Sequence, residues 1–476
     1  MIENVASIIA RALEPFAELF KAFADAGFQL YAVGGCVRDW ILGYTPKDID
    51  FTTDAIPEQT KQILAVHGYK VIPVGEAFGT IATIIHQKNY EITTFRVKES
   101  YTRGSRHPIV CYGKELERDL ERRDLTINAM AADINGRIID IFGGIDDLEN
   151  HILRVPRSSY EKTLEIFGDD PLRILRLARF KARLDFGVDP DATQAAVDMA
   201  DTILTVSHER WFAELDGLLR SPHPRAGLEW LREIHVLELI LPELCLVQKA
   251  NLRPKYLSCI KGRKKKKNQI VEDAQTLWEQ TLERIECAPA DGDLRWAALF
   301  SLTGFPVYRD SIGCAEAVSQ MWAEDGMERL KFSNVRIDSI LKVMCMLSPE
   351  EPNYRTACEM AIFLGSQIAD WEKFQEIRLT TLHPEFQASE RERLEHWCTA
   401  LEPYRSHPET AEIKLPNGLS QKLTETLGVR GKTLGLCLSQ CREAILDECL
   451  SESDDCEKFV DWVRDHYAMK NDECVP

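Results

Sequence analysis

Three features that define common protein classes are absent from this 476-residue sequence. No uninterrupted apolar run approaches the roughly 20 residues that a membrane-spanning helix requires. None of the 14 cysteines forms a CxxC pair, so we expect reduced thiols in a cytosolic protein rather than a zinc knuckle or a disulfide framework. The first residues, MIENVASIIARALEPF, have no basic region before an apolar stretch. They predict an amphipathic first helix and no signal peptide.

Positive charge is outnumbered by negative charge. The sequence has 58 Lys and Arg against 76 Asp and Glu, which gives a net charge of −18. This balance argues mildly against a nucleic-acid partner, although net charge is a weak guide when charge is unevenly placed. One segment is strongly basic, KGRKKKKNQ at residues 261–269. It is either a solvated loop or a strip that contacts phosphates.

The hydrophobic pattern changes character at about residue 155. Before that point, short β-rich runs alternate with helical patterns such as PEQTKQILAVHG, and the runs are FQLYAVGG, DIDFTT, GTIATIIH, YEITTFRV and GRIIDIF. From about residue 160 the strand signals stop and amphipathic helical stretches follow, among them PLRILRLARFKARL and SDDCEKFVDWVRDHY. The pattern predicts an α+β fold with a small mixed-sheet head and a long all-helical remainder.

Asp48 and Asp50 flank Ile49 in the predicted strand DIDFTT. Side chains two apart on a strand point the same way, so both carboxylates would share a face with Ile49 buried behind them. Close carboxylates repel each other unless a cation lies between them, and hard divalent ions suit such a site. Glu91, which opens the run EITTF, is a candidate third carboxylate. An isolated DxD is more often a solvated strand end.

Gly34 and Gly35 come shortly before the acid pair and are followed by Arg38. Backbone without a Cβ lets phosphate oxygens approach N–H groups closely, and Arg38 could balance their charge. A phosphate cradle beside an acidic pair is the arrangement that phosphoryl or nucleotidyl transfer needs. One metal ion would activate the attacking hydroxyl, and another would neutralise the triphosphate and the departing pyrophosphate.

Two further motifs are rich in arginine. In ERRDLTINAM, Arg122 and Arg123 precede Asp124, and Asn128 lies one helical turn beyond. This motif is either a surface ion-pair cluster or part of the same site.

The second arginine-rich motif is DDPLRILRLARF. Arg173, Arg176 and Arg179 recur every three residues along one side of a predicted helix, where they are not core residues. Asp170 precedes Pro171, a pair that also fits a plain helix N-cap.

The order GGCVRD, DID, RRDLTINAM, FGGIDDL, DDPLRILRLARF resembles the class II tRNA nucleotidyltransferase and poly(A) polymerase family. The resemblance covers residues 28–240 well and the remainder loosely. It implies a nucleotidyltransferase head at 1–155, a helical neck with the nucleotide-reading motif at 156–245, a body at 246–370 and an RNA-binding tail at 371–476.

The resemblance also implies the ligands. Mg²⁺ would bind Asp48 and Asp50. Glu91, the candidate third carboxylate, is predicted to be catalytic beside them. The implied partners are tRNA, with CTP and ATP as substrates and no membrane, in a cytoplasmic monomer or homodimer. The implied nucleotide contacts come from Gly35, Arg38, Arg123, Asp170, Arg173, Arg176 and Arg179. We assign Gly34, Asp124 and Asn128 to the same nucleotide site.

Asp170 and Arg173 suggest how such an enzyme selects bases without a template. Cytosine and adenine both present an amino donor beside an unprotonated ring nitrogen, whereas uracil and guanine present the reverse. A carboxylate can only accept a hydrogen bond and a guanidinium can only donate one. Asp170 facing the amino group and Arg173 facing the ring nitrogen would therefore fit C and A alone.

The sequence departs from the family pattern in two places. Asp169 stands where a Glu usually begins the base-reading motif, one methylene shorter. The stretch TLWEQTLERIECAPADGDLRWAALFSLTGFP resembles a metal-dependent HD phosphohydrolase domain. However, Gln280 replaces the first histidine and Ser301 and Leu302 replace the His-Asp pair. These side chains cannot build that metal site, so the region is predicted to be a scaffold without hydrolase activity.

The predicted function is template-independent addition or repair of the 3′ CCA end of tRNA. The alternatives are a poly(A) polymerase, a CC-only or A-only enzyme of the same family, and a catalytically dead RNA-binding paralogue. The segment TFRVKESYTRGSRHPIVCYG looks like the full-length flexible loop that CC-adding members shorten, which favours complete CCA addition. We expect that loop to act as the lever for the change from C to A. A nucleotidyltransferase for small molecules would leave the long helical remainder unexplained.

Overall fold

The computed structural model describes residues 2–73, 75–101, 108–245, 278–301, 322–345, 351–382, 384–406, 413–447 and 449–471. The chain divides into two compact units. The first holds Met1–Leu257 with two short pieces, Ala290–Gly292 and Gly326–Phe332, and the second holds the rest. No helix in the described ranges is long and apolar enough to cross a membrane. The finer division into head, neck, body and tail stays a prediction.

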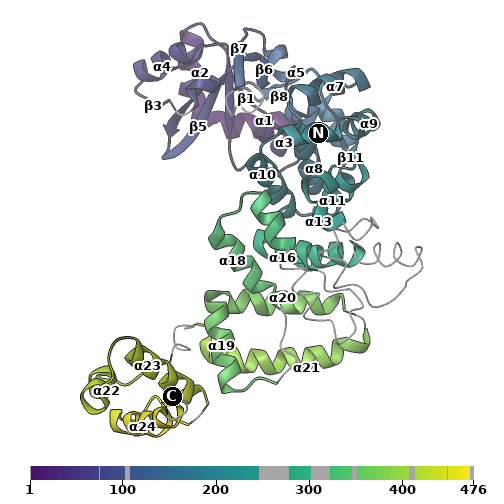
Figure 1. Ribbon diagram of the computed structural model, residues 1–476. Coiled ribbons are helices and arrows are strands. Elements are labelled where there is room, and N and C mark those ends of the chain that lie inside the picture. Colours follow the sequence, from purple (N-terminus) through teal and green to yellow (C-terminus); the bar gives the residue numbers. More distant parts are fainter. Residues whose placement is uncertain are drawn as a thin grey trace. The chain divides into compact units, whose positions relative to one another are not determined.

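A seven-stranded sheet in the order β3-β4-β5-β2-β1-β8-β9 forms the N-terminal part of the first unit (Figure 1). Its strands are β1 (Leu30–Val33), β2 (Asp50–Thr53), β3 (Lys70–Ile72), β4 (Thr80–Ile85), β5 (Lys88–Thr94), β8 (Met130–Ala132) and β9 (Ile138–Asp140). The β2–β5 pair is parallel and the other pairs of this sheet are antiparallel. The predicted mixed-sheet head is confirmed. The strand predicted at DIDFTT is shorter than expected, because it begins at Asp50 and leaves Asp48 and Ile49 in the preceding loop.

Helices cover this sheet, and a separate hairpin of β6 (Arg96–Tyr101) and β7 (Pro108–Tyr112) extends from it. Leu120 of α5 is fully buried with Val33, Ala129 and Ala131, so α5 is fixed against the sheet. The helices of this region are α1 (Ile2–Leu13), η1 (Glu14–Phe16), α2 (Ala17–Asp25), α3 (Gly35–Ile41), α4 (Pro57–Val66), η2 (Glu76–Phe78), α5 (Leu116–Glu121), η3 (Thr126–Asn128) and α6 (Gly144–Glu149).

The remainder of the first unit is helical, as predicted, apart from one short parallel pair. β10 (Ile152–Leu153) pairs with β11 (Gly187–Val188), a strand after residue 160 that the sequence did not predict. Two-residue strands carry no detectable alternation of polar and apolar residues. The helices are α7 (Tyr160–Asp169), α8 (Leu172–Leu184), α9 (Pro190–Asp198), η4 (Ala200–Thr205), α10 (His208–Leu219), α11 (Pro224–Glu233), α12 (Leu237–Ile240) and α13 (Pro242–Cys245).

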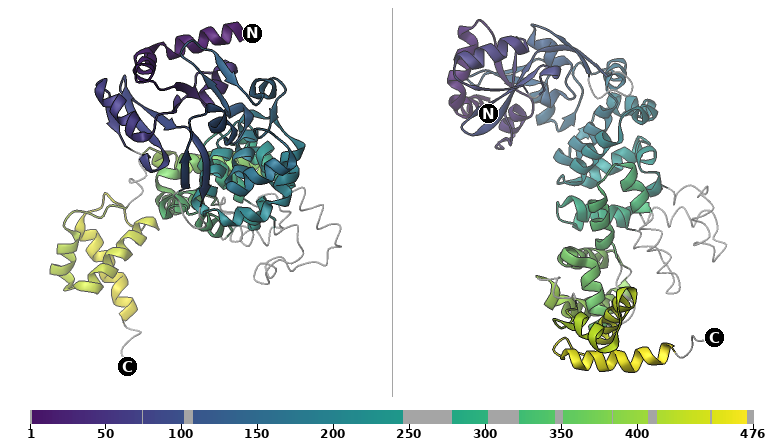
Figure 2. Two further views of the ribbon diagram at one scale, coloured as in Figure 1. Left: turned by 90° about the horizontal axis from the view of Figure 1, so that it is seen from above. Right: turned by 60° about the vertical axis from the view of Figure 1, so that its left-hand side comes forward.

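The second unit is all-helical in its described part. Near its C-terminus, α22 (Leu419–Leu427), α23 (Gly431–Leu446) and α24 (Cys456–Asn471) pack together (Figure 2). Leu423, Cys441 and Phe459, one from each of these helices, are buried in one hydrophobic cluster. Residues 278–287 and 322–325 of this unit are also helical, and the second of these helices continues to residue 329 in the first unit. The remaining helices are α16 (Gly292–Phe300), α18 (Asn334–Val343), α19 (Tyr354–Leu364), η6 (Gly365–Gln367), α20 (Ile368–Thr380), α21 (Pro384–Leu401) and η7 (Glu402–Tyr404).

Candidate active site

Three carboxylates gather at the start of β2. Asp50 opens β2 and lies directly opposite Glu91 of the parallel strand β5, and Asp48 lies two residues before it. All three residues are exposed. Desolvation raises the pKa of Asp50, and the charges of Glu91 and Asp48 raise it further, whereas Arg123 opposes them. The site is therefore a cluster of like charges that a bound cation would stabilise.

The donor set of this cluster fits Mg²⁺. In the described ranges, no group of three or more His, Cys, Asp or Glu side chains is arranged to hold a metal ion by itself. Mg²⁺ in nucleotide-handling enzymes is commonly held by one or two carboxylates together with substrate phosphates. Asp48 and Asp50 supply oxygen ligands of that kind.

The glycine turn brings a guanidinium close to the acid pair. Gly34 has a φ of +82° and precedes α3, and its N–H donates to the carbonyl of Met130 at 3.0 Å. A Cβ built on Gly34 would lie 3.0 Å from Nη1 of Arg123. Gly34 is therefore required twice, for its backbone conformation and for the close approach of Arg123. Gly35, the first residue of α3, follows it.

Arg38 lies in the interior, with 2% of its surface exposed. Its Nε and Nη2 donate to Asp39 at 2.9 and 2.7 Å, and its Nη1 donates to Oδ1 of Asn128 at 2.6 Å. The ring of Phe180 lies 5.4 Å from the guanidinium carbon. In this arrangement Arg38 connects α3 to η3 and α8, and its predicted contact with phosphate stays a prediction.

Asp124 joins the two arginine-rich motifs. One of its oxygens accepts from Nε and Nη2 of Arg176 at 2.9 and 2.6 Å, and the other accepts from Asn128 and the N–H of Leu125. Burial alone would raise the pKa of Asp124, but Arg176 and Asn128 hold it far below its usual range. The carboxylate is therefore ionised, and it ties the sheet region to α8.

Asp170 and Arg173 stand at the start of α8. Asp170 accepts from the N–H of Leu172 at 3.2 Å and from Nη2 of Arg210 at 2.8 Å. Arg173 donates to the carbonyl of Arg122 at 2.7 Å and to that of Ile166 at 3.3 Å. Asp170 thus makes a cap-like bond to Leu172, but the predicted N-cap is displaced by one residue, because α8 begins at Leu172 with Pro171 in the capping position. Asp169 is an exposed residue at the end of α7.

Arg179, one turn beyond Arg176, pairs with Glu214 of α10 at 3.1 Å. Arg173, Arg176 and Arg179 are all half-buried, as expected for arginines that are not core residues. The structure thus connects most of the predicted residues through direct contacts.

Sequence reasoning missed three residues of this network: Asp119, Arg210 and Glu214. Asp119 is fully buried and binds both Arg122 and Arg123. The spacing of Asp119 from these arginines, three and four residues, is a detectable helical ion-pair signal. Arg210 and Glu214 share the i, i+4 face of α10, but nothing in the sequence tells which helix they face.

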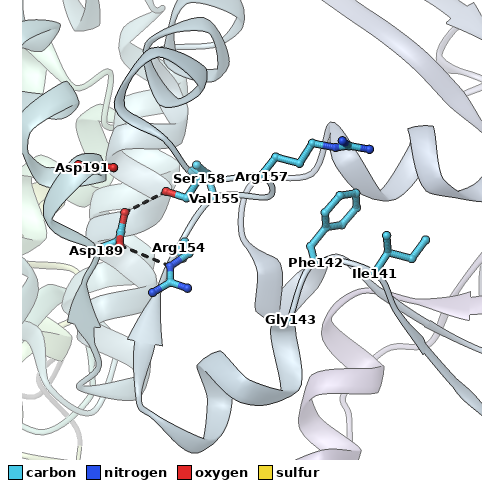
Figure 3. Close-up of a pocket in the computed structure, with 9 residues that line it drawn as sticks. All are labelled: Ile141, Phe142, Gly143, Arg154, Val155, Arg157, Ser158, Asp189 and Asp191. Carbon is cyan, nitrogen blue, oxygen red and sulfur yellow. Dashed lines mark hydrogen bonds and ion pairs between the residues drawn. The ribbon is translucent and has the colours of Figure 1, made fainter.

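A surface cavity of about 460 Å³ lies beside Phe142 and Gly143 (Figure 3). Arg157 lines it, with its guanidinium 5.6 Å from the ring of Phe142, and pairs with Glu121 of α5 at 3.0 Å. Arg154 pairs there with Asp189 at 3.4 Å. None of the predicted site residues lines this cavity.

The HD-like region of the second unit contains a buried arginine. Arg284, one helical turn after Gln280, donates to the carbonyl of Ser301 at 2.6 Å and to the hydroxyls of Thr281 and Thr381. Burial lowers the pKa of Arg284 to about 9. A guanidinium thus contacts Ser301, at the position where the family's motif supplies a metal ligand. Leu302, most of the loop at 101–107 and the lysine run at 261–267 lie outside the described residues.

Two family models match the chain. Residues 30–154 match the poly A polymerase head domain, and residues 185–246 match the probable RNA and SrmB-binding site of polymerase A. The chain is 42% identical over 243 residues to the CCA-adding enzyme of Streptococcus sanguinis (strain SK36). The aligned region covers 51% of this chain and 58% of that protein. It is also 42% identical over 227 residues to the CCA-adding enzyme of Streptococcus suis (strain 05ZYH33). That aligned region covers 48% of this chain and 53% of that protein.

The chain thus spans a little more than half the length of these curated relatives. Among solved structures, it is similar to the Bacillus stearothermophilus CCA-adding enzyme in complex with CTP, with a TM-score of 0.64 and 25% identity over 97% of this chain and 99% of that one. These matches confirm the resemblance to the tRNA nucleotidyltransferase and poly(A) polymerase family that the motifs indicated.

Proposed function

We propose that this protein is a template-independent nucleotidyltransferase that builds or repairs the 3′ CCA end of tRNA from CTP and ATP. The observation that carries the proposal is the position of Asp50, which is beside Glu91 on a parallel strand and within the field of Arg123. The carboxylates that would bind a divalent cation and the Arg123 guanidinium that would bind the triphosphate then lie at one end of the sheet. The relatives named CCA-adding enzyme support the choice of substrate.

In this proposal Asp48 and Asp50 hold Mg²⁺, while Glu91 adds negative charge beside them. When bound, Mg²⁺ supplies activation of the tRNA 3′ hydroxyl and neutralises the departing pyrophosphate. Gly34 lets the triphosphate approach the backbone, and Arg123 binds the negative charge of the triphosphate. Nη1 of Arg123 lies 3.0 Å from the position that a Cβ on Gly34 would occupy. The protein therefore acts by positioning and charge, as phosphoryl transfer requires.

Asp170 and Arg173 choose the base. Arg173 uses two N–H groups in its bonds to Arg122 and Ile166, and a guanidinium has five. Donors are thus left for the ring nitrogen of C or A. A carboxylate likewise accepts more hydrogen bonds than the two that Asp170 receives from Leu172 and Arg210. UTP or GTP would leave polar groups unpaired, at about 1–3 kcal/mol each.

The deciding experiment supplies the purified protein with tRNA that ends before CCA, together with CTP, ATP and Mg²⁺. Sequencing of the product ends should show CCA. A long run of A with ATP alone would favour the second candidate, a poly(A) polymerase, which the match to a poly A polymerase head domain supports. Ends that stop at CC or gain only A would identify a partial enzyme. tRNA binding without any addition would identify a dead paralogue. A cytoplasmic location and a monomeric or homodimeric state belong to the same proposal.

A further inference from the structure

Asp119 is a fully buried carboxylate beside the candidate site. One of its oxygens accepts from Nε and Nη2 of Arg122 at 3.2 and 2.7 Å, and the other accepts from Nη2 of Arg123 at 3.1 Å. One carboxylate thus holds two consecutive guanidiniums. Leu120, the next residue, is buried in the core of the sheet region, so the backbone around Asp119 is fixed.

The same carboxylate is attached to two strands. It accepts from the N–H of Arg96, the first residue of β6, at 3.1 Å and from the hydroxyl of Thr52 at 3.4 Å. Thr52 lies two residues after Asp50 on β2. Asp119 therefore joins α5 to β2, the strand that begins at Asp50, and to the root of the β6–β7 hairpin.

In the proposed function, Arg123 lies near the triphosphate of the bound nucleotide and Arg122 lies near its base. Nη1 of Arg123 lies over Gly34, and its charge lowers the pKa of Asp50. The carbonyl of Arg122 accepts from Nη2 of Arg173 at 2.7 Å. A shift of the Arg122–Arg123 pair would thus disturb both the triphosphate end and the base-reading end.

We infer that Asp119 is a positioning residue for nucleotidyl transfer, which holds Arg122 and Arg123 in register with Asp50 and Arg173. This inference rests on the proposed function. Burial alone would raise the pKa of Asp119, but Arg122 and Arg123 bring it to about 2. The carboxylate is therefore ionised throughout the neutral range. An ordinary exposed helical ion pair would contribute little to stability and would leave the kinetics unchanged.

The first test compares Asp119→Asn with a matched control, Asp147→Asn. Asp147 is also buried, with 3% of its surface exposed, and it pairs with Thr126 and Arg154 instead of the site arginines. Because small misplacements of positioning groups cost on the order of 10²-fold in rate, we expect Asp119→Asn to lower kcat/KM for both CTP and ATP by about that factor. It should also raise KM for the nucleotide, while Asp147→Asn stays within a few-fold of the unmodified protein. Equal losses in the two variants would overturn the inference.

The second test is a double-mutant cycle with Arg123→Lys, measured as kcat/KM. If Asp119 acts through Arg123, Asp119→Asn should cost much less in the Arg123→Lys background than alone. Additive losses would overturn the inference. If circular dichroism shows that Asp119→Asn does not fold, the cycle is run with Asp119→Glu, which keeps the charge and displaces it by one methylene. An unmodified protein that adds no nucleotide would defeat the proposed function, whereas an active one with an unaffected Asp119→Asn variant would defeat only this inference.

Discussion

Asp50 and Glu91 are direct neighbours on the parallel strands β2 and β5, although 41 positions separate them in the sequence. Parallel pairing at this register brings the two carboxylates to the same place on the sheet. The pKa of Asp50 is raised, first by desolvation and then by the negative charge of Glu91. A cation that binds between or beside the two carboxylates would relieve their repulsion and would therefore bind more tightly.

Replacing either member of the acid pair should abolish nucleotide addition. We expect Asp48→Ala or Asp50→Ala to lower kcat by on the order of 10³-fold or more, because either change removes one of the two carboxylates proposed to hold the metal ions. Binding of tRNA, measured by gel shift, should be nearly unchanged. Asp25→Ala, at an exposed position in the same unit, is the control and should remain active. Substantial turnover by the Asp50→Ala variant would place the metals elsewhere.

The raised pKa of Asp50 predicts a pH-dependent effect on stability. A carboxyl group whose pKa is higher in the folded than in the unfolded protein favours folding only while it is protonated, so its ionisation costs stability. Asp50→Asn should therefore raise the Tm near pH 7 in EDTA. The gain should shrink as pH falls through the raised pKa and disappear below the ordinary value of 3.8. A gain that persists at pH 3 would indicate a cause other than charge.

The base-reading hypothesis predicts a change in substrate choice. Two mismatched polar contacts give selectivity on the order of 10²–10⁴, and Asp170→Ala with Arg173→Ala should remove it. UTP and GTP would then compete with CTP and ATP in a mixed-nucleotide assay. Arg210→Ala is the control, because it removes the ion pair of Asp170 but leaves both readers in place. If the double variant rejects UTP and GTP as well as the unmodified protein does, only the capping role of Asp170 remains.

The HD-like region should have no hydrolase activity. Gln280 and Ser301 cannot bind a divalent metal as His and Asp do, and the guanidinium of Arg284 contacts Ser301. We expect no metal-dependent phosphatase or 2′,3′-cyclic phosphodiesterase activity above a buffer blank with Mg²⁺, Mn²⁺ or Ni²⁺. Clear hydrolysis that disappears in an Arg284→Ala variant would contradict this prediction.

The sequence alone predicted which residue types form the candidate site and the order of its motifs along the chain. Glycines before an acid pair, an RRD motif and a periodic row of arginines are local patterns, and each depends on residues a few positions apart. The change from strand-like to helical periodicity near residue 155 likewise follows from neighbouring residues. For the same reason the mixed-sheet head and the helical remainder were predictable.

Tertiary structure decided which charges meet. Arg38 is predicted from sequence as a phosphate ligand, but folding buries it against Asn128, 90 positions away. Asp119 shows in the sequence only a helical ion-pair spacing to Arg122 and Arg123, whereas its burial and its bonds to β2 and β6 come from the fold. The strength of an ion pair depends on the distance and the desolvation of both groups. Both quantities are set by chain segments far apart in the sequence, so only the folded protein fixes them.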